Sequence, residues 1–213
     1  MPSHANDHAG ATRSASSCVT AKDQRAALLA GFLGWPLAAF DYFLVVFCLT
    51  AIGDEFHKSD REMALTIAVT LAFRPVGAFL FGLLADRYGR RLPLMIDLVF
   101  YSIVEVATGL APNYLTFLIL RAAFGIGMGG EWGVGASLAM EKVSPKWRGM
   151  LSGFLQQGYA LGNLLAALCY FTLFHRWGWR PLFFLGGLPA LLAIFVRRRV
   201  KESEVWEKTA KKD

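Results

Sequence analysis

The chain has 213 residues, of which 55% are hydrophobic and only 18% are charged, and its formal net charge is +6. Because soluble domains usually carry about a quarter charged residues, this composition argues against an ordinary soluble domain and favours helices packed in a lipid bilayer. Cys18, Cys48 and Cys169 lie too far apart for a metal or redox motif, so we expect neither a metal nor a cofactor.

The N-terminal 25 residues are polar and rich in Ser, Ala and His, and a long apolar segment follows them directly. That segment exceeds the roughly 7–15 apolar residues of a cleaved signal peptide. We therefore expect no secretory signal, and we expect residues 1–25 to form a disordered cytoplasmic tail.

Six apolar stretches follow, each near the roughly 20 residues that an α-helix needs to span a bilayer. They predict an all-α membrane protein with six transmembrane helices over residues 26–196, and residues 197–213 are expected to begin a basic cytoplasmic loop. The expected spans are 26–52, 63–85, 93–111, 114–140, 149–174 and 179–196. Short connections between them predict that consecutive helices run antiparallel.

The positions of lysine and arginine predict the orientation of the helices. Sixteen of these cations lie in the two tails and in the second and fourth connections, against four in the other connections. Both termini are therefore expected in the cytoplasm and the protein in the plasma membrane. The basic charge is explained by this topology, so no nucleic-acid partner is expected.

Six ionisable side chains lie inside the expected spans, namely Asp41, Arg74, Asp97, Glu105, Arg121 and Glu131. Each costs roughly 3 kcal/mol near the bilayer centre, so it needs a partner or a water-filled cavity. At 1.5 Å per residue, Asp41 and Arg74 both lie roughly 17 Å below the outer surface. We therefore expect them to pair near the midplane, as part of a substrate site.

Glu105 and Arg121 flank the connection between the third and fourth helices at similar depths, so we expect an ion pair that joins these helices. Asp97 lies near the cytoplasmic end of its helix, where we expect a structural role. Asp41, Glu105 and Glu131 are the candidates for carrying a coupling proton, although Glu131 also fits a hydrogen bond that fixes helix orientation.

The fourth and fifth helices carry further polar and small residues. The segment "RAAFGIGMGGEWG", residues 121–133, presents glycines that allow close helix packing, and no strand precedes it as a nucleotide-binding loop would require. On the fifth helix, Tyr159 and Asn163 are four residues apart and share a face with Gln156. Together with Gln157 they form a candidate substrate-binding stripe, or alternatively hydrogen bonds between helices. No H-E-x-x-H or G-x-S-x-G motif points to an enzyme.

The connection "GLLADRYGRR" resembles the signature that follows helix 2 in the major facilitator superfamily of transporters. The matching residues are Gly82, Asp86, Arg87, Gly89, Arg90 and Arg91. Arg121, Gly125 and Gly127 fit the superfamily's R-x-x-x-G-x-G pattern on helix 4. This resemblance implies a cytoplasmic gate in which Asp86 caps a helix or pairs with an arginine.

The segments "GWPLAAFDYFLV" and "RGMLSGFLQQGYALGNLLAA" resemble the metabolite–proton symporters, the branch that holds sialic-acid symporters and lactate/pyruvate permeases. The resemblance implies a secondary active transporter that moves a carboxylate such as lactate, pyruvate or a related organic acid together with protons. It assigns substrate recognition to the arginine of helix 2, here Arg74. A sialic-acid, sugar-acid or aromatic-acid symporter remains an alternative.

The superfamily has twelve helices in two halves, each built from a 3+3 inverted repeat, with the substrate between the halves. This chain resembles the N-terminal half alone. We therefore expect its partners to be an organic anion, protons, the lipid bilayer and a missing C-terminal half or another chain. The alternative is a truncated or partner-dependent half without transport activity of its own.

Overall fold

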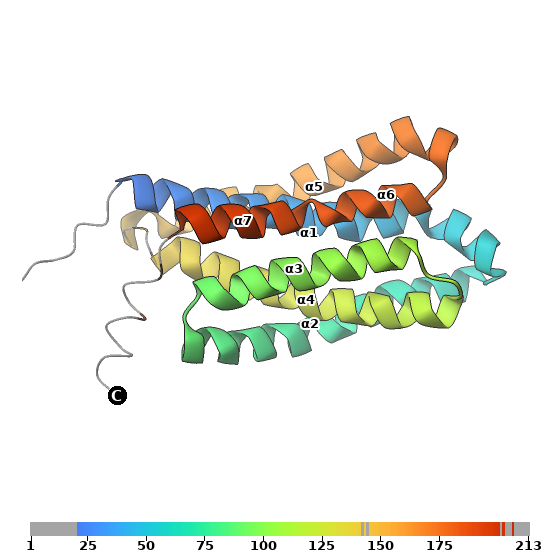
Figure 1. The fold of residues 1–213 in the computed structure, drawn as a ribbon. Helices are drawn as coiled ribbons and strands as arrows, with labels where there is room; N and C mark the ends of the chain where they lie inside the picture. Colours follow the sequence, from blue (N-terminus) through green and yellow to red (C-terminus); the bar gives the residue numbers. More distant parts are fainter. Residues whose placement is uncertain (1–20, 142, 144, 201, 203–205, 207–213) are drawn as a thin grey trace, which may run out of the picture.

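The computed structural model describes residues 21–141, 143, 145–200, 202 and 206. Most of the expected N-terminal tail and most of the C-terminal segment after residue 200 lie outside these residues. The described part is helical and contains no strand (Figure 1). Its elements are α1 (Ala21–Phe56), α2 (Asp60–Tyr88), α3 (Arg91–Gly109), α4 (Tyr114–Glu141), the 3₁₀ turn η1 (Pro145–Trp147), α5 (Arg148–Trp177), α6 (Arg180–Phe184), the 3₁₀ turn η2 (Leu185–Gly187) and α7 (Pro189–Arg199).

Helices are present at all six predicted spans, with two differences in detail. The sixth is not one continuous helix, because the Gly186–Gly187 pair and Pro189 interrupt it and divide it into α6, η2 and α7. Five stretches of the described chain are long and apolar enough to cross a membrane, and the interrupted one counts among them. The helix outside that set is α4, whose apolar sequence is diluted by Arg121, Glu131 and a run of glycines.

The helices lie side by side and alternate in direction, so the bundle has two ends (Figure 1). We call the end with the α2–α3 connection the Arg90 end and the opposite end the Glu55 end. The most extensive contacts join α2 to α4 and α1 to α5. If the first three helices are matched to the last three, so that α1 corresponds to α4 and α2 to α5, the α2–α4 contact corresponds to the α1–α5 contact. The matched helices α1 and α4 start at opposite ends of the bundle. The packing therefore has the predicted 3+3 inverted repeat.

Glycines allow these two helix pairs to meet backbone to backbone. A Cβ atom on Gly125 or Gly129 of α4 would overlap the backbone of α2, and at Gly129 the overlap is with the carbonyl of Arg74. A Cβ atom on Gly162 of α5 would overlap the carbonyl of Pro36 in α1. Such contacts between small residues hold helices together in lipid, and here they fix the position of Arg74 against α4.

The helices differ in how much of their apolar surface the bundle covers. In α1 and α3, 56% of the most apolar window is buried, against 17% in α2 and α5. Large side chains such as Phe79 of α2 and Phe171 of α5 are exposed. The α2 and α5 helices therefore present an uncovered apolar surface that suits lipid or a further set of helices.

Candidate functional site

A cavity of about 530 Å³ lies where α1, α2 and α4 meet. The half-buried Arg74 places its guanidinium 4.1 Å from the centre of the Trp132 ring, close enough for a cation–π interaction. The glycines of α4 leave room beside that ring. The cavity is lined by Trp35, Leu71, Arg74, Pro75, Ala78, Gly129, Trp132 and Gly133. We call it the Arg74 pocket.

Aromatic rings form the floor of the Arg74 pocket. Trp35 stacks on Trp132 with a centroid distance of 4.7 Å and an angle of 7° between the ring planes. Tyr159 of α5 meets Trp132 edge-on at 5.6 Å, and both Tyr42 and Tyr159 lie near enough to interact electrostatically with Arg74. A flat aromatic surface next to a guanidinium is suited to a planar carboxylate, which can stack and pair at once. The sequence reasoning missed both tryptophans, although Trp residues in apolar helices beside a charged residue are a usable signal.

The expected ion pair between Asp41 and Arg74 is not formed. No ion pair joins Arg74 to an acidic side chain in the described part of the chain. Asp41 is fully buried and faces another group of charges, where it interacts with Glu105 and Arg121. Equal depth did not imply contact, because depth along a helix says nothing about the direction in which a side chain points.

The expected pair between Glu105 and Arg121 is confirmed. The Arg121 guanidinium donates to the Glu105 carboxylate, and it also donates to the Thr108 hydroxyl at 2.8 Å. Both charged side chains are buried. Three rings surround the guanidinium, those of Phe117, Phe124 and Phe183.

Asp41 completes this group, which we call the Arg121 cluster (Asp41, Glu105, Thr108 and Arg121). Its carboxylate lies beside the break in the last span, where a Cβ atom on Gly186 would come within 3.0 Å of Asp41 and would overlap Glu105. Neither oxygen of Asp41 has a hydrogen-bond partner among the described residues. Two buried acids thus share one cation, and the excess negative charge can be neutralised by a proton.

The remaining two acids in the spans also come together. Asp97 of α3 and Glu131 of α4 are buried and interact electrostatically. Glu131 fits against Gly34 of α1, whose missing side chain leaves space for the carboxylate. Neither oxygen of Asp97 has a hydrogen-bond partner in the described part of the chain, so its expected structural role stays a prediction.

The α5 residues of the predicted polar stripe are divided between different surroundings. Only Tyr159 reaches the Arg74 pocket, through its ring contact with Trp132. Asn163 is half-buried, whereas Gln156 and Gln157 are exposed on the uncovered side of α5. A substrate-binding role for these three polar residues stays a prediction.

The signature connection at the Arg90 end is held by charged side chains. Arg90 pairs with Asp86 at 2.6 Å, as predicted, and with Glu141 at the end of α4 at 3.3 Å. Arg91 donates to the backbone carbonyl of Arg197 in α7. These contacts join α2, α3, α4 and α7. Of the other signature residues, Arg87 lies over the Tyr88 ring and Gly82 has open space around its Cα.

Glu202 and Trp206, two residues after α7, also contact this connection, which the sequence reasoning did not predict. The Glu202 carboxylate accepts hydrogen bonds from the backbone N–H groups of Arg90 at 2.8 Å and Arg91 at 3.2 Å, where α3 begins. The predicted cap, Asp86, does not take this position. Gly89 is required here, since its φ is +91° and a Cβ atom would overlap Glu202. Trp206 donates to the carbonyl of Asp86 at 2.7 Å.

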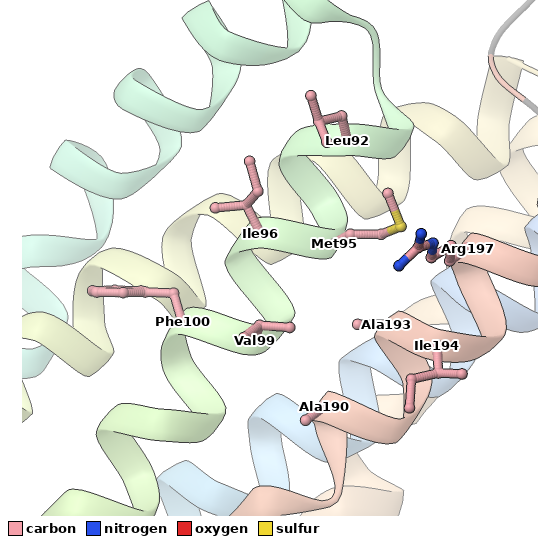
Figure 2. Close-up of a pocket in the computed structure, with 9 residues that line it drawn as sticks. All are labelled: Leu92, Met95, Ile96, Val99, Phe100, Ala190, Ala193, Ile194 and Arg197. Atoms are coloured by element: carbon pink, nitrogen blue, oxygen red, sulfur yellow. The ribbon is translucent and has the colours of Figure 1, made fainter.

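A larger groove of about 720 Å³ runs between α3 and α7 (Figure 2). Apolar side chains of both helices line it, and Arg197 at the Arg90 end is its one charged lining residue. It holds no acid and no second polar group among its lining residues. The groove therefore offers an apolar surface that suits lipid. A polar substrate is better matched by the Arg74 pocket, which contains a guanidinium.

The sequence is similar to those of known transporters. The family model described as "Sugar (and other) transporter" matches residues 7–213. A protein of Cupriavidus pinatubonensis named "Probable 4-methylmuconolactone transporter" is 36% identical over 190 residues, covering 87% of this chain and 44% of that protein. A sialic acid transporter of Escherichia coli is 32% identical over 190 residues, covering 89% of this chain and 47% of that protein.

The fold is similar to that of a solved transporter. The xylose transporter of Escherichia coli, in a partially occluded inward-open conformation, matches with a TM-score of 0.77 and 24% identity over 89% of this chain and 53% of that one. This chain spans about half the length of the curated relatives that it matches. Its helices are those of an integral multi-pass membrane protein, and the chain belongs to the sugar and other transporter family of the major facilitator superfamily.

Proposed function

We propose that this chain is the N-terminal half of a proton-coupled transporter of organic carboxylates. The observation that carries the proposal is the Arg74 guanidinium, which lies half-buried over Trp132 and has no acidic partner among the described residues. A permanent cation is costly within a membrane unless it is paired or wet. A carboxylate substrate supplies the missing partner through a charge-assisted, bidentate pair.

The aromatic floor narrows the substrate class. The rings of Trp35 and Trp132 are nearly parallel and stacked, so a flat acid gains more contact than a bulky one. Lactate, pyruvate and unsaturated or aromatic acids fit a pocket of about 530 Å³. The relatives named for sialic acid and 4-methylmuconolactone support an organic acid as the general class.

Proton coupling follows from the buried acids. In the Arg121 cluster, Asp41 and Glu105 share one cation, so one proton neutralises the group. Asp41 is the better proton carrier, because Glu105 is already committed to its hydrogen-bonded pair with Arg121. Glu131 is a second carrier close to the Arg74 pocket.

Alternating access requires a second half and a gate. The uncovered α2 and α5 helices are the surface against which the second half packs. In this proposal the protein lies in the plasma membrane and its Arg90 end faces the cytoplasm. The contacts among Asp86, Arg90 and Glu141 then hold the cytoplasmic ends of α2, α3 and α4 together. These contacts must loosen or shift when the two halves rock about the substrate.

The test is uptake of labelled lactate, pyruvate and flat organic acids by proteoliposomes that contain this chain together with its completing half. Arg74→Ala should abolish uptake. Arg74→Lys should retain weak uptake, because losing the bidentate geometry costs about 1.5–3 kcal/mol, or roughly 10- to 100-fold in apparent affinity. Arg61→Ala, an exposed arginine on the same helix, is the matched control and should transport normally.

Two results would contradict the proposal. Normal uptake by the Arg74→Ala variant would remove Arg74 from the substrate site. Uptake that does not respond to a pH gradient would show that transport is not coupled to protons.

A half without transport activity of its own is the second candidate function, favoured by the exposed apolar surface of α2 and α5. Proteoliposomes that contain the 213-residue chain with its completing half, compared with proteoliposomes that contain the chain alone, separate the two. We expect no uptake from the chain alone, and uptake only when the completing half is present.

A further inference from the structure

The α3 helix buries a row of three polar side chains. Asp97, Tyr101 and Glu105 are spaced four residues apart, so they lie on one face of the helix, with about 6 Å of rise between successive members. All three are completely buried. An apolar helix in lipid gains nothing in packing from an acid, a phenol and an acid on its inner face, so this row requires another explanation.

Each end of the row meets acidic side chains from a neighbouring helix. Glu105 belongs to the Arg121 cluster, toward the Glu55 end of the bundle. Asp97 meets Glu131 of α4, nearer the Arg90 end. Tyr101 lies between them and interacts electrostatically with all four acids, Asp41 included.

The middle and the Asp97 end of this row carry polar atoms without partners. Both oxygens of Asp97, the Tyr101 hydroxyl and Oε2 of Glu131 are buried and form no hydrogen bond with the described residues. Buried polar groups in proteins are nearly always hydrogen-bonded. Unpartnered polar atoms on these three side chains are consistent with groups that exchange protons, with water bridging between them.

The charge around Asp97 and Glu131 also requires a proton. Among the described residues, Tyr101 of α3 interacts with both acids, and the cation of α4, Arg121, is paired with Glu105. From α2, Arg74 lies over the Trp132 ring, and the arginines of α7 are exposed at the Arg90 end. With no cation of their own, two adjacent buried carboxyl groups cannot both be ionised, so one proton remains with the pair.

One member of this pair, Glu131, lies near residues that line the Arg74 pocket. Glu131 precedes Trp132 in α4, and its carboxylate fits against Gly34, which precedes Trp35 in α1. Glu131 is therefore close in the chain or in contact with the residue next to each of the two tryptophans that line the pocket.

We propose that Asp97 and Glu131 form a second proton-binding site and that the Tyr101 hydroxyl transfers protons between this site and the Arg121 cluster. In each transfer, the phenol gives its proton toward the acceptor carboxylate and takes one from the donor carboxylic acid, through bridging water. No net charge stays on Tyr101. The role in transport rests on the proposed function, whereas the proton site itself can be tested on this chain alone.

The site is tested by infrared spectroscopy of the 213-residue chain in lipid nanodiscs. The C=O stretch of protonated carboxylic acids, identified by its shift in D₂O, should be present at neutral pH. Glu131→Gln and Asp97→Asn should each change this band. Asp60→Asn, which alters an exposed acid at the start of α2, is the matched control and should leave the band unchanged. A band that neither buried variant changes would overturn the site.

The transfer is tested with Tyr101→Phe, which keeps the ring that packs edge-on against Phe124 at 6.0 Å. After a pH jump, the band assigned to Asp97 and Glu131 should respond at least about tenfold more slowly than in the unmodified chain, since a positioned acid–base group typically accelerates proton transfer by 10²–10⁴. Tyr114→Phe removes a phenol that hydrogen-bonds the Glu62 carbonyl outside the row, and it should respond at the normal rate. An unchanged rate in Tyr101→Phe, with thermal unfolding confirming that both variants are folded, would overturn the transfer.

These outcomes separate this inference from the proposed function. If Tyr101→Phe slows proton exchange but the completed transporter takes up no carboxylate, the proton-transfer inference stands and the proposed substrate class is wrong. If the completed transporter takes up carboxylates but the variants leave the infrared band unaffected, the proposed function stands and the proton-transfer inference is wrong.

Discussion

The three charged members of the Arg121 cluster should contribute very unequally to stability, although all are buried. Arg121 pairs with Glu105 and donates to Thr108 at 2.8 Å. Arg121→Gln leaves two buried acids without a cation, and losing one member of a buried ion pair costs about 3–5 kcal/mol.

The two acids should differ from each other for a structural reason. Glu105→Gln keeps an acceptor for Arg121 and leaves Asp41 to balance its charge, so the loss should be about 1.5–3 kcal/mol, the value of a hydrogen bond to a charged group. The Asp41 carboxylate accepts no hydrogen bond from the described residues. Asp41→Asn should therefore change the free energy of unfolding by less than about 1 kcal/mol.

The assay is unfolding of the full chain in mixed micelles with increasing sodium dodecyl sulfate, followed by tryptophan fluorescence and circular dichroism. The order Arg121→Gln, Glu105→Gln, Asp41→Asn, from most to least destabilised, is the expected result. If Asp41→Asn costs as much as Glu105→Gln, then Asp41 is a full partner of Arg121 and the unequal sharing described above is refuted. If Arg121→Gln unfolds like the unmodified chain, the cluster does not stabilise the bundle.

Two further predictions concern the backbone contacts. Gly129→Ala places a Cβ atom against the Arg74 carbonyl and should destabilise the chain by about 1–3 kcal/mol, whereas Gly133→Ala on the same helix meets nothing within 4 Å and should be neutral or stabilising. Equal thermal unfolding of these two variants would contradict the close approach of α2 and α4. Glu202→Gln weakens the acceptor at the start of α3, so the amides of Arg90 and Arg91 should exchange with D₂O roughly fivefold faster, as for a loss of about 1 kcal/mol. The Thr116 amide, capped by Asn113 at the opposite end, should exchange unchanged, and equal rates at Arg90 would show that Glu202 does not cap α3.

The sequence was sufficient to predict the helices and to predict contacts between helices that a short turn connects. Glu105 and Arg121 flank a short turn, so equal depth also brings them close together, and their pair is confirmed. Asp41 and Arg74 lie on consecutive helices as well, but α1 packs mainly on α5 and α2 mainly on α4. Because the principal partners are not neighbours in sequence, depth alone predicted a pair that does not form.

The parts that could not be predicted depend on long-range packing. The stack of Trp35 on Trp132 joins α1 to α4, and Glu202 reaches an amide 112 residues away. No local pattern encodes either contact. The break between α6 and α7 was predictable, since Gly186, Gly187 and Pro189 are all helix-breaking residues in one short segment.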